Sequence, residues 1–411
     1  MSDWYQRMRT EIAAGGGLVE KDVVSPGGRA TGLVMLGLLG WLAWASPWAF
    51  VFVVGLLVSV FLHEVGHWST ARLTGMKVTQ FFMGFGPRVW SRRRGEIEWG
   101  VRALPLGAFV RIIGMNNLDE VEPADEPRAY RSKSFPRRLL VITAGSLMHM
   151  VIAFVLFAGV YATAGKEQNT GVAVVRDIVV DGPAQRAGIT LGDEIVSIDG
   201  EPISSYETLV EVVRARRAGD IVRVVYDRDD VERSVDVELA GNPSIVGVGY
   251  LGVAADDWGW ERLALPDALW QGVADIGTMA GRSVTGVVQA LNPVNSLRHL
   301  TDDTGSIENR PVTVVGISQI SSDVGRFDGL KGILVLLASI NVFVGVFNMF
   351  PLLPFDGGHA AIAVYERIRS RGGRVYRADI SKMVPVATTV IALLAVLMLT
   401  GLWLDITRPL G

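Results

Sequence analysis

Long apolar stretches constrain the fold of this 411-residue chain more than any other feature of its sequence. About 20 apolar residues are needed to cross the roughly 30 Å hydrocarbon core of a bilayer. The ranges 139–164, 332–355 and 386–404 each meet this length. The chain is 49% hydrophobic and only 20% charged, which is more apolar than most soluble proteins. We therefore predict a multi-pass α-helical protein of the cell (plasma) membrane.

A further apolar region, residues 30–62, is too long for one ordinary span. Ser46-Pro47 interrupts it, and proline disfavours helix interiors. The pattern favours two helices, near 30–46 and 48–71, which gives four core transmembrane helices plus an extra N-terminal one. One kinked helix, or a signal peptide cleaved after Ala43-Trp44-Ala45, is the alternative.

Lysine and arginine indicate the orientation of the spans, because they concentrate in cytoplasmic loops. They cluster in residues 72–138 and 366–384, so the region 165–331 should lie outside the cytoplasm. The net charge of −3 gives no reason to expect a nucleic-acid partner. The predicted segments are an N-terminal extension (1–29), a transmembrane region (30–71), a cytoplasmic loop with a β-hairpin or sheet (72–137), a transmembrane helix (138–164), a soluble α/β domain (169–255), an amphipathic helical or linker region (256–330), a transmembrane helix (331–365), a cytoplasmic loop (366–384) and a C-terminal transmembrane helix (385–404).

The sequence His63-Glu64-Val65-Gly66-His67 closes one apolar run. On a helix, His63 and His67 lie at positions i and i+4, so both imidazoles can hold one metal ion. Glu64 is then placed to take a proton from a water beside that metal. An ionisable group at mid-bilayer costs on the order of 3 kcal/mol, so three of them require a reason. The alternative is that the helix has reached the interface and the side chains meet water.

A third ligand must be His, Asp or Glu, because the chain has no cysteine. Asp356 is the candidate, since it ends a late apolar span and precedes Gly357-Gly358. Pro351 and Pro354 break the helix just before it, which frees backbone groups that must face something polar or be buried. The alternative is a plain turn at a helix end.

Together, H-E-x-G-H in an early span and N-x-x-P-x-x-P-x-x-D-G-G in a late span resemble the site-2 protease family. The likeness is greatest to the bacterial branch that carries an extracytoplasmic PDZ domain, and to its actinobacterial members. It extends to 84–87 and 105–109 in the loop after the first motif. The resemblance implies that Zn²⁺ is bound by His63, His67 and Asp356, that Glu64 is the catalytic base, and that Asn348 holds the substrate or transition state.

The chain departs from the family at its G-P-x-x-N motif. The corresponding residues run from Gly145 to His149, with Ser146 in place of proline and His149 in place of asparagine. His149 could contact substrate, approach the metal, or be a satisfied interior histidine; substrate contact is the role we assign to it. His359, one turn after Asp356, is expected at a helix surface or behind the metal ligands, and His299 in an exposed loop.

Residues 181–189 and 192–200 resemble the PDZ signature of bacterial membrane-associated proteases. The short stretch Tyr250-Leu251-Gly252 resembles a PDZ carboxylate-binding loop, which implies binding of a peptide C-terminus as an added strand. The alternative is an ordinary last strand. A helix is expected near 206–218.

In the cytoplasmic loop, residues 88–90, 96–103 and 108–113 read as short strands with a turn around Arg94-Gly95. The resemblance implies a membrane-associated sheet whose edge pairs with unwound substrate. The alternative is a plain solvated hairpin.

These features predict an intramembrane zinc endopeptidase that cleaves transmembrane segments in regulated intramembrane proteolysis. Family likeness points to a single-span membrane protein as substrate, for example a pre-cut anti-sigma factor, within the lipid bilayer. The rival hypotheses are a non-catalytic PDZ adaptor with a vestigial metal site, and a membrane zinc peptidase that acts on remnant signal peptides.

Overall fold

The computed structural model describes residues 26–115, 119–243, 245, 247–290, 312–370 and 375–408. The chain forms two compact units. The helical unit comprises Met1–Leu156, Gly272–Asp323 and Ile333–Gly411, and the β-unit comprises Phe157–Gln271 with Val324–Gly332. Most of the N-terminal extension, and His299, lie outside the described residues.

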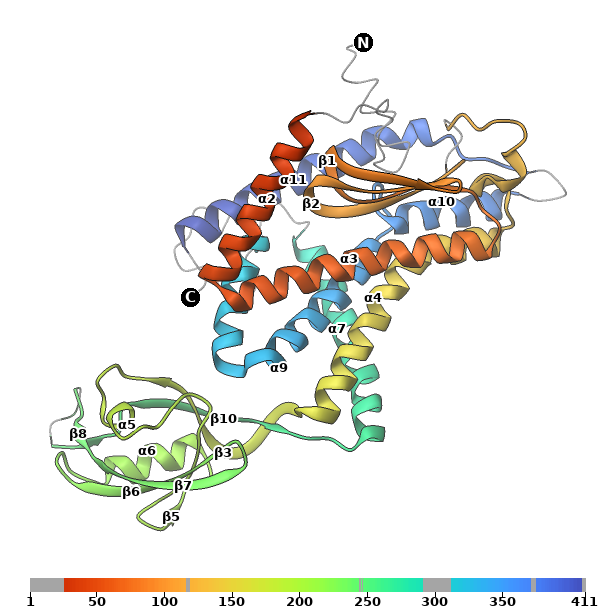
Figure 1. Ribbon diagram of the computed structural model, residues 1–411. Coiled ribbons are helices and arrows are strands. Elements are labelled where there is room, and N and C mark those ends of the chain that lie inside the picture. Colours follow the sequence, from red (N-terminus) through yellow and green to blue (C-terminus); the bar gives the residue numbers. More distant parts are fainter. Residues whose placement is uncertain are drawn as a thin grey trace. The chain divides into compact units, whose positions relative to one another are not determined.

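Within the described ranges, five helices are long and apolar enough to cross a membrane. They are α2 (Pro26–Ala45), α3 (Pro47–Leu73), α4 (Phe135–Thr163), α9 (Val314–Asn348) and α11 (Val384–Thr407) (Figure 1). The prediction of two helices around Ser46 is confirmed. The Ser46 hydroxyl accepts a hydrogen bond from the Ala49 amide at 3.4 Å, and Pro47 opens α3, a position that needs no backbone donor.

Helix α9 begins 18 residues earlier than the expected start at 332, as its bounds show. Its first part contains charged and polar residues, which hydropathy alone assigns to a linker. Gly329 interrupts the helical dihedrals with φ 61°, a conformation that glycine adopts without strain. The helix ends at Asn348 rather than 355, because Pro351 and Pro354 follow, and α10 (Asp356–Arg369) then begins.

The loop after α3 forms a two-stranded antiparallel hairpin of β1 (Val78–Arg94) and β2 (Ile97–Ile112). The short strands predicted at 88–90, 96–103 and 108–113 fall within β1 and β2 to within one residue, and register shifts around Pro87 and Pro105 divide each long strand into two paired segments. The turn after Arg94 is as predicted. The hairpin packs against α2 and α3, and two 3₁₀ turns, η1 (Glu126–Arg128) and η2 (Tyr130–Ser132), follow it (Figure 1).

The β-unit is built on an antiparallel sheet with strand order β10-β3-β4-β6-β7, with β5 beside β4. Its core contains Ile195, Leu209 and Val224, all nearly inaccessible to solvent. Its strands are β3 (Lys166–Ile178), β4 (Glu194–Ile198), β5 (Glu201–Pro202), β6 (Ile221–Arg228), β7 (Val231–Glu238), β8 (Ala240–Gly241), β9 (Gly249–Tyr250) and β10 (Val253–Glu261), and its short helices are α5 (Pro183–Arg186) and α6 (Tyr206–Arg214). Helix α6 lies where the sequence predicted a helix, and β10 is an edge strand.

Two elements complete the described chain. Helix α7 (Leu265–Ala290) has the amphipathic character predicted for the region after the β-unit sheet. A 3₁₀ turn, η4 (Ile380–Met383), leads from the loop after α10 into α11.

Candidate metal centre

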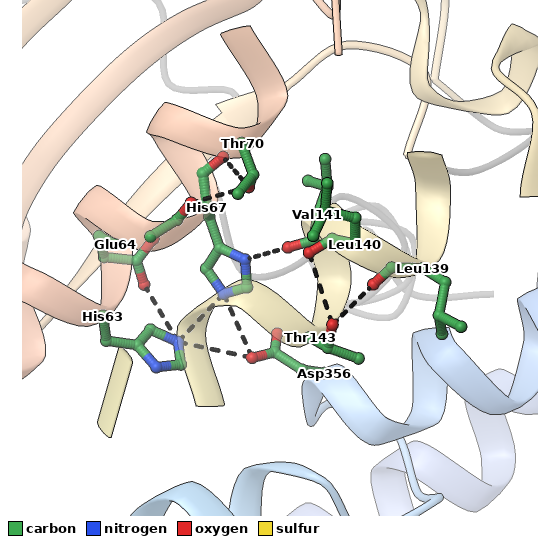
Figure 2. A network of polar contacts seen from close by, with 10 residues as sticks. His63, Glu64, His67, Thr70, Leu139, Leu140, Val141, Thr143 and Asp356 are labelled. Atoms are coloured by element: carbon green, nitrogen blue, oxygen red, sulfur yellow. Dashed lines mark hydrogen bonds and ion pairs between the residues drawn. The ribbon is translucent and has the colours of Figure 1, made fainter. Parts of the chain in front are cut away.

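Three side chains from two distant parts of the sequence converge in the helical unit. His63 and His67 lie one turn apart on α3, and Asp356 is the first residue of α10 (Figure 2). The two Nε2 atoms are 3.1 Å apart. Asp356 Oδ2 lies 3.2 Å from His67 Nε2 and 3.5 Å from His63 Nε2. The three atoms thus form a nearly equilateral triangle inside the protein.

The size of this triangle fits a tetrahedral zinc ion. Ligands about 2.0–2.1 Å from zinc at tetrahedral angles are roughly 3.3 Å from one another, which matches the three edges. Asp356 Oδ2 is buried and accepts no hydrogen bond from the described residues. Two imidazole nitrogens and a carboxylate oxygen facing one another repel unless a cation or proton lies between them. Among the described residues, these three are the group of His, Asp and Glu side chains suited to hold a metal.

The backbone of α4 fixes the orientation of His67. Its Nδ1 lies 2.7 Å from the Val141 carbonyl oxygen, which can only accept a hydrogen bond (Figure 2). His67 therefore carries its proton on Nδ1 and presents a lone pair on Nε2, as a metal-ligating histidine requires. His63 Nδ1 is buried and finds no such partner in the described part of the chain. Glu64 Oε1 lies 4.0 Å from His63 Nε2, beside the triangle rather than in it.

Two glycines make room for the triangle. A Cβ on Gly145 of α4 would lie 2.4 Å from His67 Nε2 and 2.4 Å from His63 Cε1. A Cβ on Gly66, between the histidines, would lie 2.7 Å from the Ala144 carbonyl oxygen. The bare backbone of α4 therefore closes one side of the site. Gly145 belongs to the motif that the sequence comparison singled out, but its contact with both imidazoles could not be read from sequence.

His149 sits in a buried polar chain across three apolar helices. Its ring centroid lies 4.9 Å from that of His63, and its Nδ1 lies 2.8 Å from Asn341 Oδ1 of α9. The Asn341 amide donates to the Leu337 carbonyl oxygen at 2.8 Å and to Ser59 Oγ of α3 at 3.1 Å. These donations orient the amide, so His149 Nδ1 carries a proton and, in the neutral ring, Nε2 keeps its lone pair.

Sequence reasoning missed Asn341 and Ser59. A signal was present, because an amide in the middle of the run 333–347 has no apolar reason to be there. His149, Asn341 and Ser59 are each at most 2% exposed.

The other predicted site residues lie at different distances from this centre. Asn348 is the half-buried last residue of α9 and precedes the non-helical segment that leads to Asp356. His359 is buried on α10, so the expectation of a surface position was wrong. Tyr250 ends β9, and Leu251 and Gly252 form the connection to β10 in the β-unit, so the structure does not group them with the metal centre.

An apolar groove runs beside the site in the helical unit. Its cavity volume is about 610 Å³. It is lined by Thr143, Ser146, Leu147 and Met150 of α4, by Val284 of α7, and by Gly345, Val346, Met349, Phe350 and Pro351. Ser146 is 4% exposed, and its hydroxyl finds no hydrogen-bond partner in the described residues. The groove therefore offers an unused polar group within an apolar surface, next to Gly145.

Comparison with known proteins places this site in a family context. Residues 51–392 match Peptidase family M50. The chain is 31% identical over 392 residues to a protein of Mycobacterium tuberculosis named zinc metalloprotease Rip1, covering 88% of this chain and 97% of that one. It is 32% identical over 398 residues to zinc metalloprotease Rip1 of Mycolicibacterium smegmatis, with the same coverage.

One solved structure to which part of this chain is similar is the PDZ domain of an SdrC-like protein from Listeria monocytogenes. It is 22% identical, with a TM-score of 0.20, and the match covers 21% of this chain and 90% of that one.

Proposed function

The chain belongs to peptidase family M50, the site-2 proteases, and is a membrane zinc metalloprotease; on this premise we propose that His63, His67 and Asp356 hold its zinc ion and that Glu64 is its general base. The observation that carries the assignment is the triangle of 3.1, 3.2 and 3.5 Å between their ligand atoms. Neither the family nor the named relatives favour the two rival hypotheses, a PDZ adaptor and a signal-peptide peptidase. A non-catalytic adaptor would have no need of a complete set of metal ligands.

Bound zinc would polarise the scissile carbonyl and lower the pKa of a water to about 7. Glu64, beside the triangle, takes the proton of the attacking water and later passes it to the leaving amine. His67 is held in the required tautomer by the Val141 carbonyl, and Asp356 supplies the negative charge. His149, whose ring lies 4.9 Å from that of His63, and Asn348, at the end of α9, contact the backbone of the substrate.

The substrate is a transmembrane segment of another protein, with a pre-cut single-span protein such as an anti-sigma factor as the specific candidate. The groove supports this, because it is apolar and its lining includes Ser146, the residue after Gly145. A helix must open before its peptide bonds can be cleaved. Ser146 in the groove and the outer segments 88–94 of β1 and 108–112 of β2 offer hydrogen bonds to the opened segment.

The base assignment is tested with a model span peptide and the purified full-length protein. Glu64→Gln keeps the size of the side chain but removes its basicity. We expect cleavage to fall at least 100-fold, within the range for general acid–base catalysis, while zinc stays at one ion per chain. Equal cleavage by the wild type and by Glu64→Gln would show that Glu64 is not the general base. Cleavage that a zinc chelator does not abolish would contradict the zinc mechanism.

The third-ligand assignment needs a separate measurement. Asp356→Asn preserves the volume but removes the charge, and we expect zinc affinity to fall at least tenfold. Unchanged affinity in both Asp356→Asn and Asp356→Ala would exclude Asp356 as a ligand.

The β-unit is proposed to capture a peptide C-terminus. Its edge strand β10 directly follows the Leu251-Gly252 connection. The carbonyls of this connection accept hydrogen bonds from the Ala184 and Val179 amides, which fix it against the start of α5 and the end of β3, and its own amides are proposed to bind the carboxylate. We propose that the unit is extracytoplasmic and the hairpin cytoplasmic. A reporter inserted at Gly200 should be active outside the cytoplasm; cytoplasmic activity would overturn this orientation.

Substrate identity is best approached by trapping. Cells that produce Glu64→Gln should accumulate uncut single-span proteins on the enzyme, and the captured proteins should be cleaved by the wild type in vitro. Capture of free signal peptides alone would favour the rival peptidase.

A further inference from the structure

A large pocket lies between the end of α3 and the β1–β2 hairpin, within the helical unit and separate from the metal centre. Its cavity volume is about 910 Å³. It is lined by Trp68 and Arg72 of α3, by Trp90 and Arg92–Arg94 of β1, and by Ile97 and Trp99 of β2. The lining thus combines four arginines with three tryptophans and contains no acidic residue.

The arginines of this pocket have no acidic partner in the described part of the chain. The two carboxylates nearest in sequence are engaged elsewhere: Glu96 binds the Arg128 guanidinium through both oxygens, at 2.6 and 2.8 Å, and Glu98 binds Arg88 at 2.6 Å. Arg72 and Arg92–Arg94 are exposed. Positive charge that a fold leaves unpaired in one cavity is complementary to an anionic ligand.

The aromatic part of the pocket is built into the fold. Trp68 and Trp99 pack edge to face with ring centroids 5.5 Å apart, and Trp99 stacks on Phe81 at 4.7 Å. The Arg72 guanidinium lies 5.4 Å from the centre of the Trp68 ring. Trp90 is 55% exposed at the rim. The tryptophans therefore give a rigid apolar wall beneath the guanidinium groups.

The position of the pocket relative to the membrane indicates which class of anion it binds. Arg72 is in the last turn of α3, a membrane-spanning helix that ends at Leu73, whose side chain is 83% exposed. The end of a span lies at the depth of lipid headgroups, where tryptophan is enriched. The proposed orientation puts this end at the cytoplasmic leaflet, which carries anionic lipids.

We propose that this pocket binds the headgroup of an anionic phospholipid of the surrounding membrane. The phosphate lies among the guanidinium groups of Arg72 and Arg92–Arg94, which suit phosphate through paired N–H donors, and the tryptophan rings contact the glycerol and the start of the acyl chains. Trp68 is one helical turn after Glu64, so an occupied pocket would brace the helix that carries the proposed base.

The experiment uses the purified full-length protein in a neutral detergent, with short-chain phosphatidylglycerol and phosphatidylcholine as probes. We expect saturable binding of about one phosphatidylglycerol per chain and at least tenfold weaker binding of phosphatidylcholine. The variant Arg92→Gln/Arg93→Gln/Arg94→Gln should bind phosphatidylglycerol at least tenfold more weakly. The matched control Arg214→Gln/Arg217→Gln/Arg233→Gln removes the same charge from exposed positions of the β-unit and should bind like the wild type.

Further measurements distinguish a pocket for a lipid headgroup from one for free phosphate or for an acidic peptide. Trp90→Ala, at a position whose side chain is 55% exposed, should weaken lipid binding about threefold or more. Inorganic phosphate at the lipid concentration should not displace the lipid. Displacement by phosphate or by an acidic peptide such as oligoglutamate, or equal weakening in the β-unit control, would overturn the proposal. One zinc ion per chain in each variant verifies folding and keeps this result independent of the metal-site tests.

Discussion

At the scale of single residues, Gly145 shows how closely α4 approaches the proposed ligands. Gly145→Ala would drive a methyl group into His63 and His67, since the ideal Cβ lies 2.4 Å from both rings. Neither ring can withdraw without leaving the triangle. We expect zinc affinity to fall at least tenfold while the protein remains folded, as measured by metal competition on purified protein.

The same helix supplies the control for this substitution. A Cβ on Gly159 of α4 would meet no heavy atom within 4 Å. Gly159→Ala should leave zinc affinity unchanged and stabilise the helix by up to about 1 kcal/mol. Equal zinc affinity in the Gly145 and Gly159 variants would show that the site tolerates the methyl group.

The polar chain from Ser59 through Asn341 to His149 leads to a second residue-scale prediction. Asn341→Leu keeps the approximate shape but leaves His149 Nδ1 without its acceptor at 2.8 Å. His149 can then rotate or change tautomer, while the three proposed ligands are untouched. We expect at least tenfold slower peptide cleavage with one zinc ion per chain retained. Loss of zinc together with activity would instead make Asn341 a purely structural residue.

At the scale of elements, one buried ion pair ties α4 to α10. Arg138 Nη2 lies 2.7 Å from Glu366 Oε2, and both side chains are less than 10% exposed. Glu366 Oε1 also accepts the Ala378 amide at 2.8 Å. Removing one partner of a buried pair costs about 3–5 kcal/mol, because the other charge stays buried. Glu366→Gln should therefore lower the thermal unfolding temperature by several degrees.

The control for that measurement is an exposed pair. Arg223 and Asp236 lie on the surface of neighbouring strands β6 and β7. Exposed pairs contribute little, so Asp236→Asn should leave the unfolding temperature unchanged. A similar drop in both variants would refute the special role of the α4–α10 pair.

A second element-scale feature is a clasp around Asp328, near the middle of α9. Asp328 accepts a hydrogen bond from Trp260 Nε1 at 2.8 Å and lies 3.5 Å from Arg176 Nη1, while Lys331 lies over the Trp260 ring. The next residue, Gly329, carries the helix break. Asp328→Ala should raise hydrogen exchange across 324–332. Glu232→Ala, on the exposed face of β7, should not; no difference between the variants would refute the clasp.

At the scale of the whole molecule, all three proposed zinc ligands belong to the helical unit. Removing zinc should therefore loosen α3 and α10 and leave the β-unit sheet as it is. Hydrogen exchange with and without a chelator measures this directly. Increased exchange in β3, β4 and β6 on zinc removal would show that the metal stabilises both units.

The spans could be predicted from the sequence, because the length and apolarity of a segment define a span. The convergence of His63, His67 and Asp356 could also be predicted, because charged groups within a span are costly and need partners. The sequence did not predict features that depend on tertiary contacts. Register shifts place Pro87 and Pro105 inside β1 and β2, and Asp405 accepts hydrogen bonds from the Thr313 and Gly316 amides at the start of α9. The link between His149 and Asn341 depends on helix packing that periodicity does not encode.

The separation of the proposed ligands along the chain has a consequence for biosynthesis. His63 and His67 leave the ribosome early, whereas Asp356 emerges only when most of the polypeptide has been made. A nascent chain held in the translocon thus lacks the means to cut its neighbours. On the proposed ligand set, the metal site is complete only when the late span has joined the early one.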